Sequence, residues 1–154
     1  MANSFPKFLR LTALMLLARP ALPGTAPSVV VVANVSVTGS AISQDELQEV
    51  FLGTRHSLAN GSRVIPVLLK SGSAHELFLK SYLGKSIEGF RTWWLRYVFT
   101  GQGLLPKTFA SEAELIDYVA RTKGAVGYVT PASVRGNVKC LAVSSESSST
   151  GGQP

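Results

Sequence analysis

A continuous run of β-branched residues, Val29-Val-Val-Val-Ala33, limits most strongly how this chain of 154 residues can fold. β-branched side chains favour extended backbone. The run shows no alternation of polar and apolar residues, which is typical of a strand buried on both faces, as in an α/β sheet. The length is sufficient for one domain with a core, and the apolar share of 45% fits a globular chain.

Strand and helix signals alternate along the rest of the chain. Ser43-x-x-Glu46 is a capping box, and Gly53 is placed to end the helix that it opens. Ser73 is predicted to open a helix that ends at Gly84. Further strands are predicted over residues 64–69, 125–129 and 137–143, and further helices over residues 90–98 and from Ser111 to Gly124. This order predicts a single α/β domain with a mixed sheet flanked by helices. Pro66 indicates that its strand is irregular or close to an edge.

The two ends of the chain differ from the predicted domain. Residues 1–26 have the basic, apolar and small-residue order of a signal peptide, with Lys7 and Arg10 before an apolar run at residues 11–18. That run is much shorter than the roughly 20 residues of a membrane-spanning helix; a buried first helix is the alternative. We expect export to the periplasm, with cleavage between residues 21 and 29. The domain would span residues 28–143, followed by a disordered low-complexity tail at residues 144–154.

Charge and cysteine content exclude further classes of protein. The formal net charge is +6, but no run of Lys or Arg occurs, so a nucleic-acid-binding face is not indicated. Cys140 is the only cysteine, which excludes a disulfide within the chain. Because it lies in an apolar, strand-like run, we expect a buried free thiol. No cysteine lies near the end of the apolar run at residues 11–18, which favours a cleaved protein over a lipid-anchored one.

The segment Ser71-Gly72-Ser73 is the strongest candidate for a ligand site. It lies between a predicted strand and a predicted helix, where free N–H groups and the helix dipole favour an anion. Gly72 permits a close approach to the backbone, the two hydroxyls add donors, and Lys70 adds positive charge. The alternative is purely structural: Ser73 caps the helix and Gly72 makes a turn.

Three blocks in a fixed order resemble the second lobe of the phosphate-binding proteins that serve ABC transporters. They are Leu47-Gln-Glu-Val-Phe-Leu-Gly53, Ser71-Gly-Ser-Ala-His-Glu-Leu-Phe78 and Gly124-Ala-Val-Gly-Tyr-Val129. The resemblance covers roughly residues 29–143 and implies a single periplasmic-binding-protein-like lobe. It implies that Ser71, Gly72 and Ser73 donate hydrogen bonds to phosphate, with serine in place of the family's threonine. It also implies a binding protein, not an enzyme, that needs no cofactor and has an ABC permease or a sensor protein as its partner.

Two departures from the family leave two functional hypotheses open. The family's arginine and aspartate before the motif are missing from Val67-Leu68-Leu69-Lys70, and Lys70 cannot offer the planar fork of an arginine. The family's first lobe is missing as well. The leading hypothesis is a periplasmic protein that binds phosphate or a similar oxyanion weakly. The alternative is a ligand-free interaction or sensor-accessory module, and a homo-oligomer is an open possibility for both.

Other candidate residues give weaker evidence for a ligand site or a catalytic site. Ser111, with the loop Thr100-Gly-Gln-Gly103, could form a second anion site, although plain helix capping is favoured. His75 could contact an ion bound at the loop, although a plain surface position is favoured for it. His56 and His75, without a cluster of carboxylates or cysteines, do not predict a metal site. Ser71 lacks the Gly-x-Ser-x-Gly context of a hydrolase nucleophile.

The third predicted helix carries aromatic residues at helical spacing. Phe90, Trp93, Trp94, Tyr97 and Val98 would form one apolar face, and the two tryptophans are expected to belong to the core. Arg91 and Arg96 are expected to face the solvent.

Overall fold

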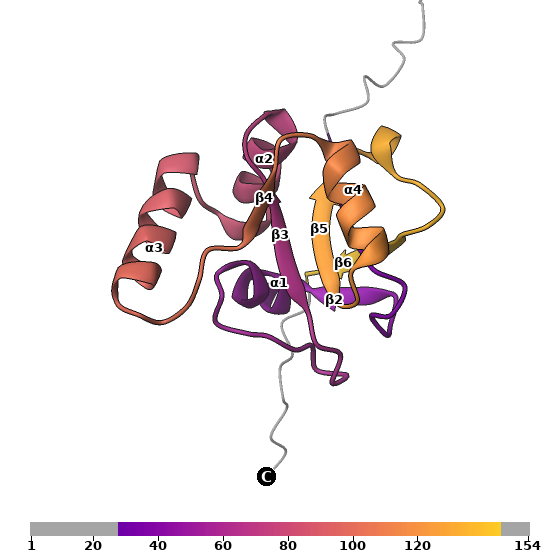
Figure 1. The fold of residues 1–154 in the computed structure, drawn as a ribbon, viewed down its shortest axis with the longest axis horizontal. Coiled ribbons are helices and arrows are strands. Elements are labelled where there is room, and N and C mark those ends of the chain that lie inside the picture. Colours follow the sequence, from indigo (N-terminus) through magenta and orange to yellow (C-terminus); the bar gives the residue numbers. More distant parts are fainter. Residues whose placement is uncertain (1–27, 146–154) are drawn as a thin grey trace, which may run out of the picture.

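The computed structural model of the chain describes residues 28–145. Six strands, four α-helices and two shorter helical turns follow one another in the order shown in Figure 1. The elements are β1 (Val30–Ala33), β2 (Ala41–Ser43), α1 (Gln44–Phe51), β3 (Ile65–Leu69), α2 (Ser73–Phe78), the π-helical turn η1 (Leu79–Leu83), α3 (Ile87–Phe99), β4 (Lys107–Phe109), α4 (Glu112–Arg121), β5 (Ala125–Val129), the 3₁₀ turn η2 (Pro131–Ser133) and β6 (Lys139–Ser144).

The strands form one mixed sheet in the order β2-β6-β1-β5-β3-β4. β1 lies in the middle and pairs antiparallel with both neighbours: Val31 is opposite Tyr128 of β5 and Leu141 of β6. The other pairings are parallel, namely β2 with β6, β3 with β5 and β3 with β4. The predicted α/β class with a mixed sheet is therefore confirmed.

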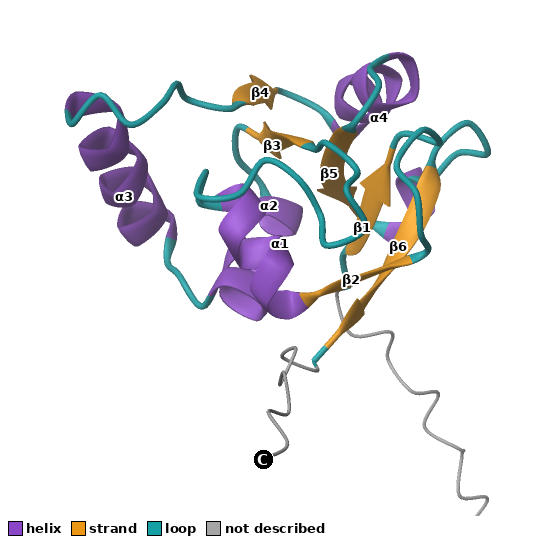
Figure 2. Cartoon of the chain, turned by 90° about the horizontal axis from the view of Figure 1, so that it is seen from below, coloured by secondary structure: helices purple, strands orange, loops and turns teal. Residues whose placement is uncertain are grey.

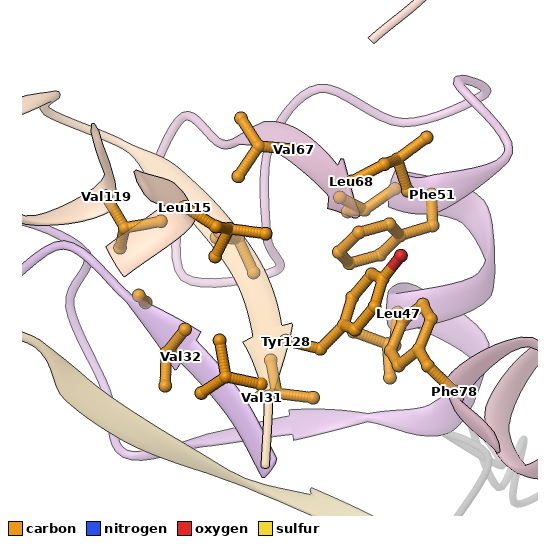
Figure 3. Close-up of a cluster of buried hydrophobic side chains, with 14 of the residues drawn as sticks. Val31, Val32, Leu47, Phe51, Val67, Leu68, Phe78, Leu115, Val119 and Tyr128 are labelled. Atoms are coloured by element: carbon orange, nitrogen blue, oxygen red, sulfur yellow. The ribbon is translucent and has the colours of Figure 1, made fainter. Parts of the chain in front are cut away.

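Helices cover both faces of the sheet, as the apolar run of β1 predicted. The two faces are seen at β5, where consecutive residues point to opposite sides. A side chain at Gly127 would meet Leu115 of α4, whereas the ring of Tyr128 contacts Phe51 of α1 and Phe78 of α2. Figure 2 shows α4 on one side of the sheet and α1 with α2 on the other, and Figure 3 shows the two groups of buried side chains.

Local signals place the helices well. Ser43 and Glu46 form the predicted capping box at the start of α1. The helix that begins at Ser73 continues through η1 and ends at Gly84, whose φ of 62° is left-handed, as predicted. In α3, Phe90 and Trp94 are buried and Trp93 and Tyr97 pack against the core, so the predicted apolar face is confirmed.

The prediction was incomplete for three short elements. β2, β4 and η2 span three residues each and were not predicted. β6 reaches Ser144, one residue beyond the expected end of the domain. The expected signal peptide and the rest of the expected disordered tail lie outside the described residues.

The prediction of a buried Cys140 was wrong, because this side chain is exposed. Burial alternates along β6, where Leu141 faces the core and its two neighbours face outward. The core-facing side of β6 packs against α1, whereas α4 packs against β1, β3, β4 and β5. The pleat of the strand thus turns the thiol of Cys140 away from the face that carries Leu141 and toward solvent.

None of the helices formed by residues 28–145 is long and apolar enough to cross a membrane.

Candidate functional site

The loop Lys70-Ser71-Gly72 joins the C-terminal end of β3 to the start of α2. Its first residue is fixed by a backbone hydrogen bond of 2.8 Å from Lys70 N–H to the carbonyl of Phe109 in β4. The first helical hydrogen bond runs from the N–H of Glu76 to the carbonyl of Gly72 at 3.1 Å. Lys70, Ser71, Gly72 and Ser73 are all exposed. The structure thus brings these four residues together at an open surface.

Most donors beyond Lys70 in this loop and in the first turn of α2 have no partner among the described residues. The backbone N–H groups of Gly72, Ser73 and Ala74 make no hydrogen bond with residues 28–145, and neither do the hydroxyls of Ser71 and Ser73. N–H groups in the first turn of a helix lack intrahelical partners and carry partial positive charge. This arrangement can accept an anion.

Gly72, and not Ser73, occupies the N-cap position of α2. Gly72 has φ 105° and ψ 169°, and no side chain caps the helix. The structural alternative in which Ser73 caps this helix is therefore wrong. A φ of this size is readily accessible only to glycine, so Gly72 sets the direction in which the loop enters the helix. The hydroxyl of Ser73 is left available for a ligand.

A buried polar contact lies directly beneath the loop. The hydroxyl of Tyr128 is 2.5 Å from Nδ1 of His75, and the same oxygen accepts a hydrogen bond of 3.2 Å from the N–H of Leu69. His75 is only 6% exposed, so its expected surface position was wrong. The contact joins the end of β3, the first turn of α2 and the C-terminal half of β5.

The tautomer of His75 follows from these two hydrogen bonds. The oxygen of Tyr128 already accepts from Leu69, and the only other hydrogen-bonding atom placed against it by residues 28–145 is Nδ1 of His75. The hydroxyl proton therefore points to Nδ1, and the imidazole carries its own proton on Nε2. Burial lowers the pKa of His75 from its usual 6.5, against an opposing contribution from Glu76. Burial also raises the pKa of Tyr128, which keeps this hydroxyl protonated.

We expect the stability of the protein to fall as the pH drops below the ordinary histidine pKa of 6.5. The folded protein holds His75 neutral, whereas the unfolded chain binds a proton there, so acid favours unfolding. Above that pKa both states are neutral and this contribution to stability is complete. The His75→Gln variant should lose less stability than the wild type between pH 7 and pH 5, as measured by urea unfolding at each pH.

His56 offers a matched control for this measurement, because it is the chain's other histidine and its side chain is exposed. The His56→Gln variant should retain the pH dependence of the wild type. A pH dependence that is unchanged by His75→Gln would contradict the assignment.

The remaining sequence candidates have structural roles or lie apart. The hydroxyl of Ser111 accepts the N–H of Glu114 at 3.2 Å, as expected for plain helix capping. The hydroxyl of Thr100 donates to carbonyls at the C-terminal end of α3, and Figure 1 shows α3 and α4 on different sides of the fold. The second anion site proposed from these two segments is thus not assembled. Arg91 and Arg96 are exposed, as predicted.

Residues 28–145 contain no group of three or more His, Cys, Asp and Glu side chains placed to hold a metal ion.

No protein-family model and no curated protein matches this sequence. Solved structures do match. One is a protein from Clostridium perfringens assigned as a phosphate ABC transporter substrate-binding protein and solved with bound phosphate, with a TM-score of 0.60 and 11% identity. Another is PstS from Borrelia burgdorferi, with a TM-score of 0.59 and 13% identity.

The match covers 77% of this chain but only 46% and 48% of those two structures. The chain thus spans about half the length of the solved structures that it matches. The predicted fold is confirmed by this comparison: a single lobe of the periplasmic-binding-protein type.

Proposed function

We propose that this protein binds phosphate or a similar oxyanion weakly, through the loop Lys70-Ser71-Gly72-Ser73, and that it catalyses no reaction. One observation carries the proposal: the N–H groups of Gly72, Ser73 and Ala74 and the hydroxyls of Ser71 and Ser73 have no partner among the described residues. The fold of the chain supports it, since a matching structure holds phosphate. Lys70 supplies the positive charge and Gly72 leaves the backbone open to the ligand.

The number of donors sets the expected affinity. A charge-assisted hydrogen bond contributes about 1.5–3 kcal/mol, so three or four of them at an open surface give roughly 5–8 kcal/mol. Association costs about 4 kcal/mol or more, whereas a micromolar dissociation constant requires about 8 kcal/mol net. The expected affinity is therefore millimolar or weaker, and it should decrease with added salt.

Calorimetric titration of the protein with phosphate tests this proposal. Lys70→Gln should weaken binding severalfold because it removes the charge of the loop. Joint replacement of Ser71 and Ser73 by alanine should also weaken binding, and it should leave stability nearly unchanged because neither hydroxyl caps α2. Gly72→Val should block the approach of the anion.

Lys80→Gln is the matched control, because it removes an exposed lysine from η1, outside the loop. It should leave phosphate binding unchanged. Micromolar binding by a monomer would overturn the argument from the number of donors. Binding that survives both Lys70→Gln and Gly72→Val would place the anion elsewhere.

The second candidate function is an interaction or sensor-accessory module that keeps the fold and binds no ligand. One observation favours it: the apolar end of β3, Val67-Leu68-Leu69, is buried and supplies no arginine or aspartate next to the loop. Absence of any heat of binding at tens of millimolar phosphate would favour this candidate over the first.

We propose that the protein acts outside the cytoplasm, in the periplasm, with an ABC permease or a sensor protein as its partner. The matching structures include an ABC-type phosphate transport receptor from Vibrio cholerae, which supports the kind of partner. Mass spectrometry of the protein from periplasmic extracts should find a chain that starts between residues 21 and 29. An intact segment 1–26 on the soluble, folded protein would contradict export with cleavage.

A further inference from the structure

We propose that a second site, at the opposite end of β3 from the loop Lys70–Ser73, binds a small organic anion that carries two or more negative charges on an apolar body. The site is a recess of about 660 Å³, a volume typical of small-molecule sites. Arg63, Lys123 and His56 line it together with Ile65, Pro66 and Ser36. We call it the basic recess.

The basic recess is built where three segments meet at one edge of the sheet. β3 and β5 run parallel, so their N-terminal ends lie side by side, as Figure 1 shows. The N–H of Ile65 donates to the carbonyl of Gly124 at 2.8 Å, and the N–H of Val64 donates to the carbonyl of His56 at 3.0 Å. These bonds fix the backbone positions from which the three basic side chains start.

Close packing at Gly124 brings the two permanent cations together. A Cβ atom on Gly124 would lie 2.7 Å from the carbonyl oxygen of Arg63, so only glycine allows this approach. Lys123 precedes Gly124 directly. The N–H of Gly124 donates to the hydroxyl of Ser36 at 3.0 Å, which ties the loop after β1 to the same place.

The charge of the basic recess is not balanced by residues 28–145, since no carboxylate from that part of the chain lines it. The ion pairs found within residues 28–145 are those of Arg55 with Glu46 and Glu49, so neither Arg63 nor Lys123 is paired there. Two cations in one recess repel each other, and an anion that contacts both removes that repulsion. A ligand with at least two negative charges matches this pattern.

The apolar wall indicates that the anion is organic. β4 pairs with β3 only from Val67 onward, so the first residues of β3 have a strand on one side alone. Ile65 is consequently 46% exposed, beside Pro66 in the same recess. Burial of this surface by an apolar body adds affinity that an inorganic ion cannot gain. This site is independent of the proposed phosphate loop, because the whole length of β3 separates the two.

NMR titration of the full-length protein with benzene-1,3,5-tricarboxylate, a flat trianion, tests the proposal. We expect shifts of the amide signals of Arg63, Ile65 and Gly124, and no shift at Gly72. Benzoate, with one charge, and inorganic phosphate, with no apolar body, should each bind the basic recess at least about tenfold more weakly, which corresponds to about 1.4 kcal/mol.

Charge-matched variants complete the test. The double variant Arg63→Gln with Lys123→Gln should raise the dissociation constant for the trianion at least about tenfold. Arg91→Gln with Arg96→Gln, which removes the same charge from the exposed side of α3, should change it less than about twofold. The proposal is overturned if the trianion shifts no signal near Gly124. It is also overturned if both double variants weaken binding equally, or if phosphate shifts these signals as strongly as the trianion does.

Discussion

Replacement of Tyr128 by phenylalanine is expected to lower the free energy of unfolding by about 2–4 kcal/mol, although it removes a single oxygen atom. That oxygen accepts the N–H of Leu69 and contacts Nδ1 of His75. Without it, two buried polar groups lose their partner, and each unsatisfied group costs about 1–3 kcal/mol. The aromatic ring is retained, so its stacking on Phe78, with ring centroids 3.8 Å apart, should persist. Urea unfolding monitored by circular dichroism measures the loss.

Tyr118 provides the control for this prediction. Its ring is half-buried against Phe109, and its hydroxyl makes no hydrogen bond with residues 28–145. Tyr118→Phe should change the free energy of unfolding by less than about 0.5 kcal/mol. Equal losses in the two variants would show that the hydroxyl of Tyr128 does not stabilise the core.

Replacement of Gly124 by alanine is expected to destabilise the fold by about 3 kcal/mol or more. Gly124 has a φ of +78°, and a Cβ atom there would lie 2.7 Å from the backbone oxygen of Arg63. The left-handed backbone costs an alanine about 1–2 kcal/mol. The overlap adds about 1–3 kcal/mol, because the carbonyl of Arg63 belongs to backbone that is held in a β-bridge with Ser57 just before β3 and cannot move aside easily. Thermal and urea unfolding of the variant measure the sum.

Gly61 separates these two contributions. Its φ of +84° is close to that of Gly124, but nothing lies within 4 Å of a Cβ atom built there. Gly61→Ala should therefore cost only the left-handed backbone term of about 1–2 kcal/mol. The difference between the two variants measures the overlap with Arg63, and no difference would mean that the backbone at Arg63 relaxes around the added methyl group.

Sequence patterns predicted the helices and strands whose positions depend on residues close together in the chain. The β-branched run became β1, the capping box opened α1, and Gly84 ended the helix that begins at Ser73. β2 and β4 were missed because three residues carry no usable period. These strands exist only through their pairing with β6 and β3, which no local pattern reveals.

Local sequence does not show contacts between distant segments, and this explains why the burial of His75 and the basic recess were not predicted. The loop was located from its residues, but the burial of His75 depends on Tyr128, a partner 53 positions away in the chain. A histidine in the first turn of a helix looks solvated until the ring above it is known. Arg63 and Lys123 belong to different segments, so only the parallel pairing of β3 with β5 brings them into one recess.

The position of β1 determines when this chain can fold. Its residues pair with β5 and β6, so the central strand is the first element of the domain and its partners are the last. Val31 meets Leu141 only after nearly the whole domain has been synthesised. Contacts between such distant segments slow folding, because a large loop must close before the sheet gains its central pairings. A nascent chain of this protein should therefore stay unfolded until β6 is available, and a ribosome-bound chain that stops before Lys139 should remain sensitive to proteases.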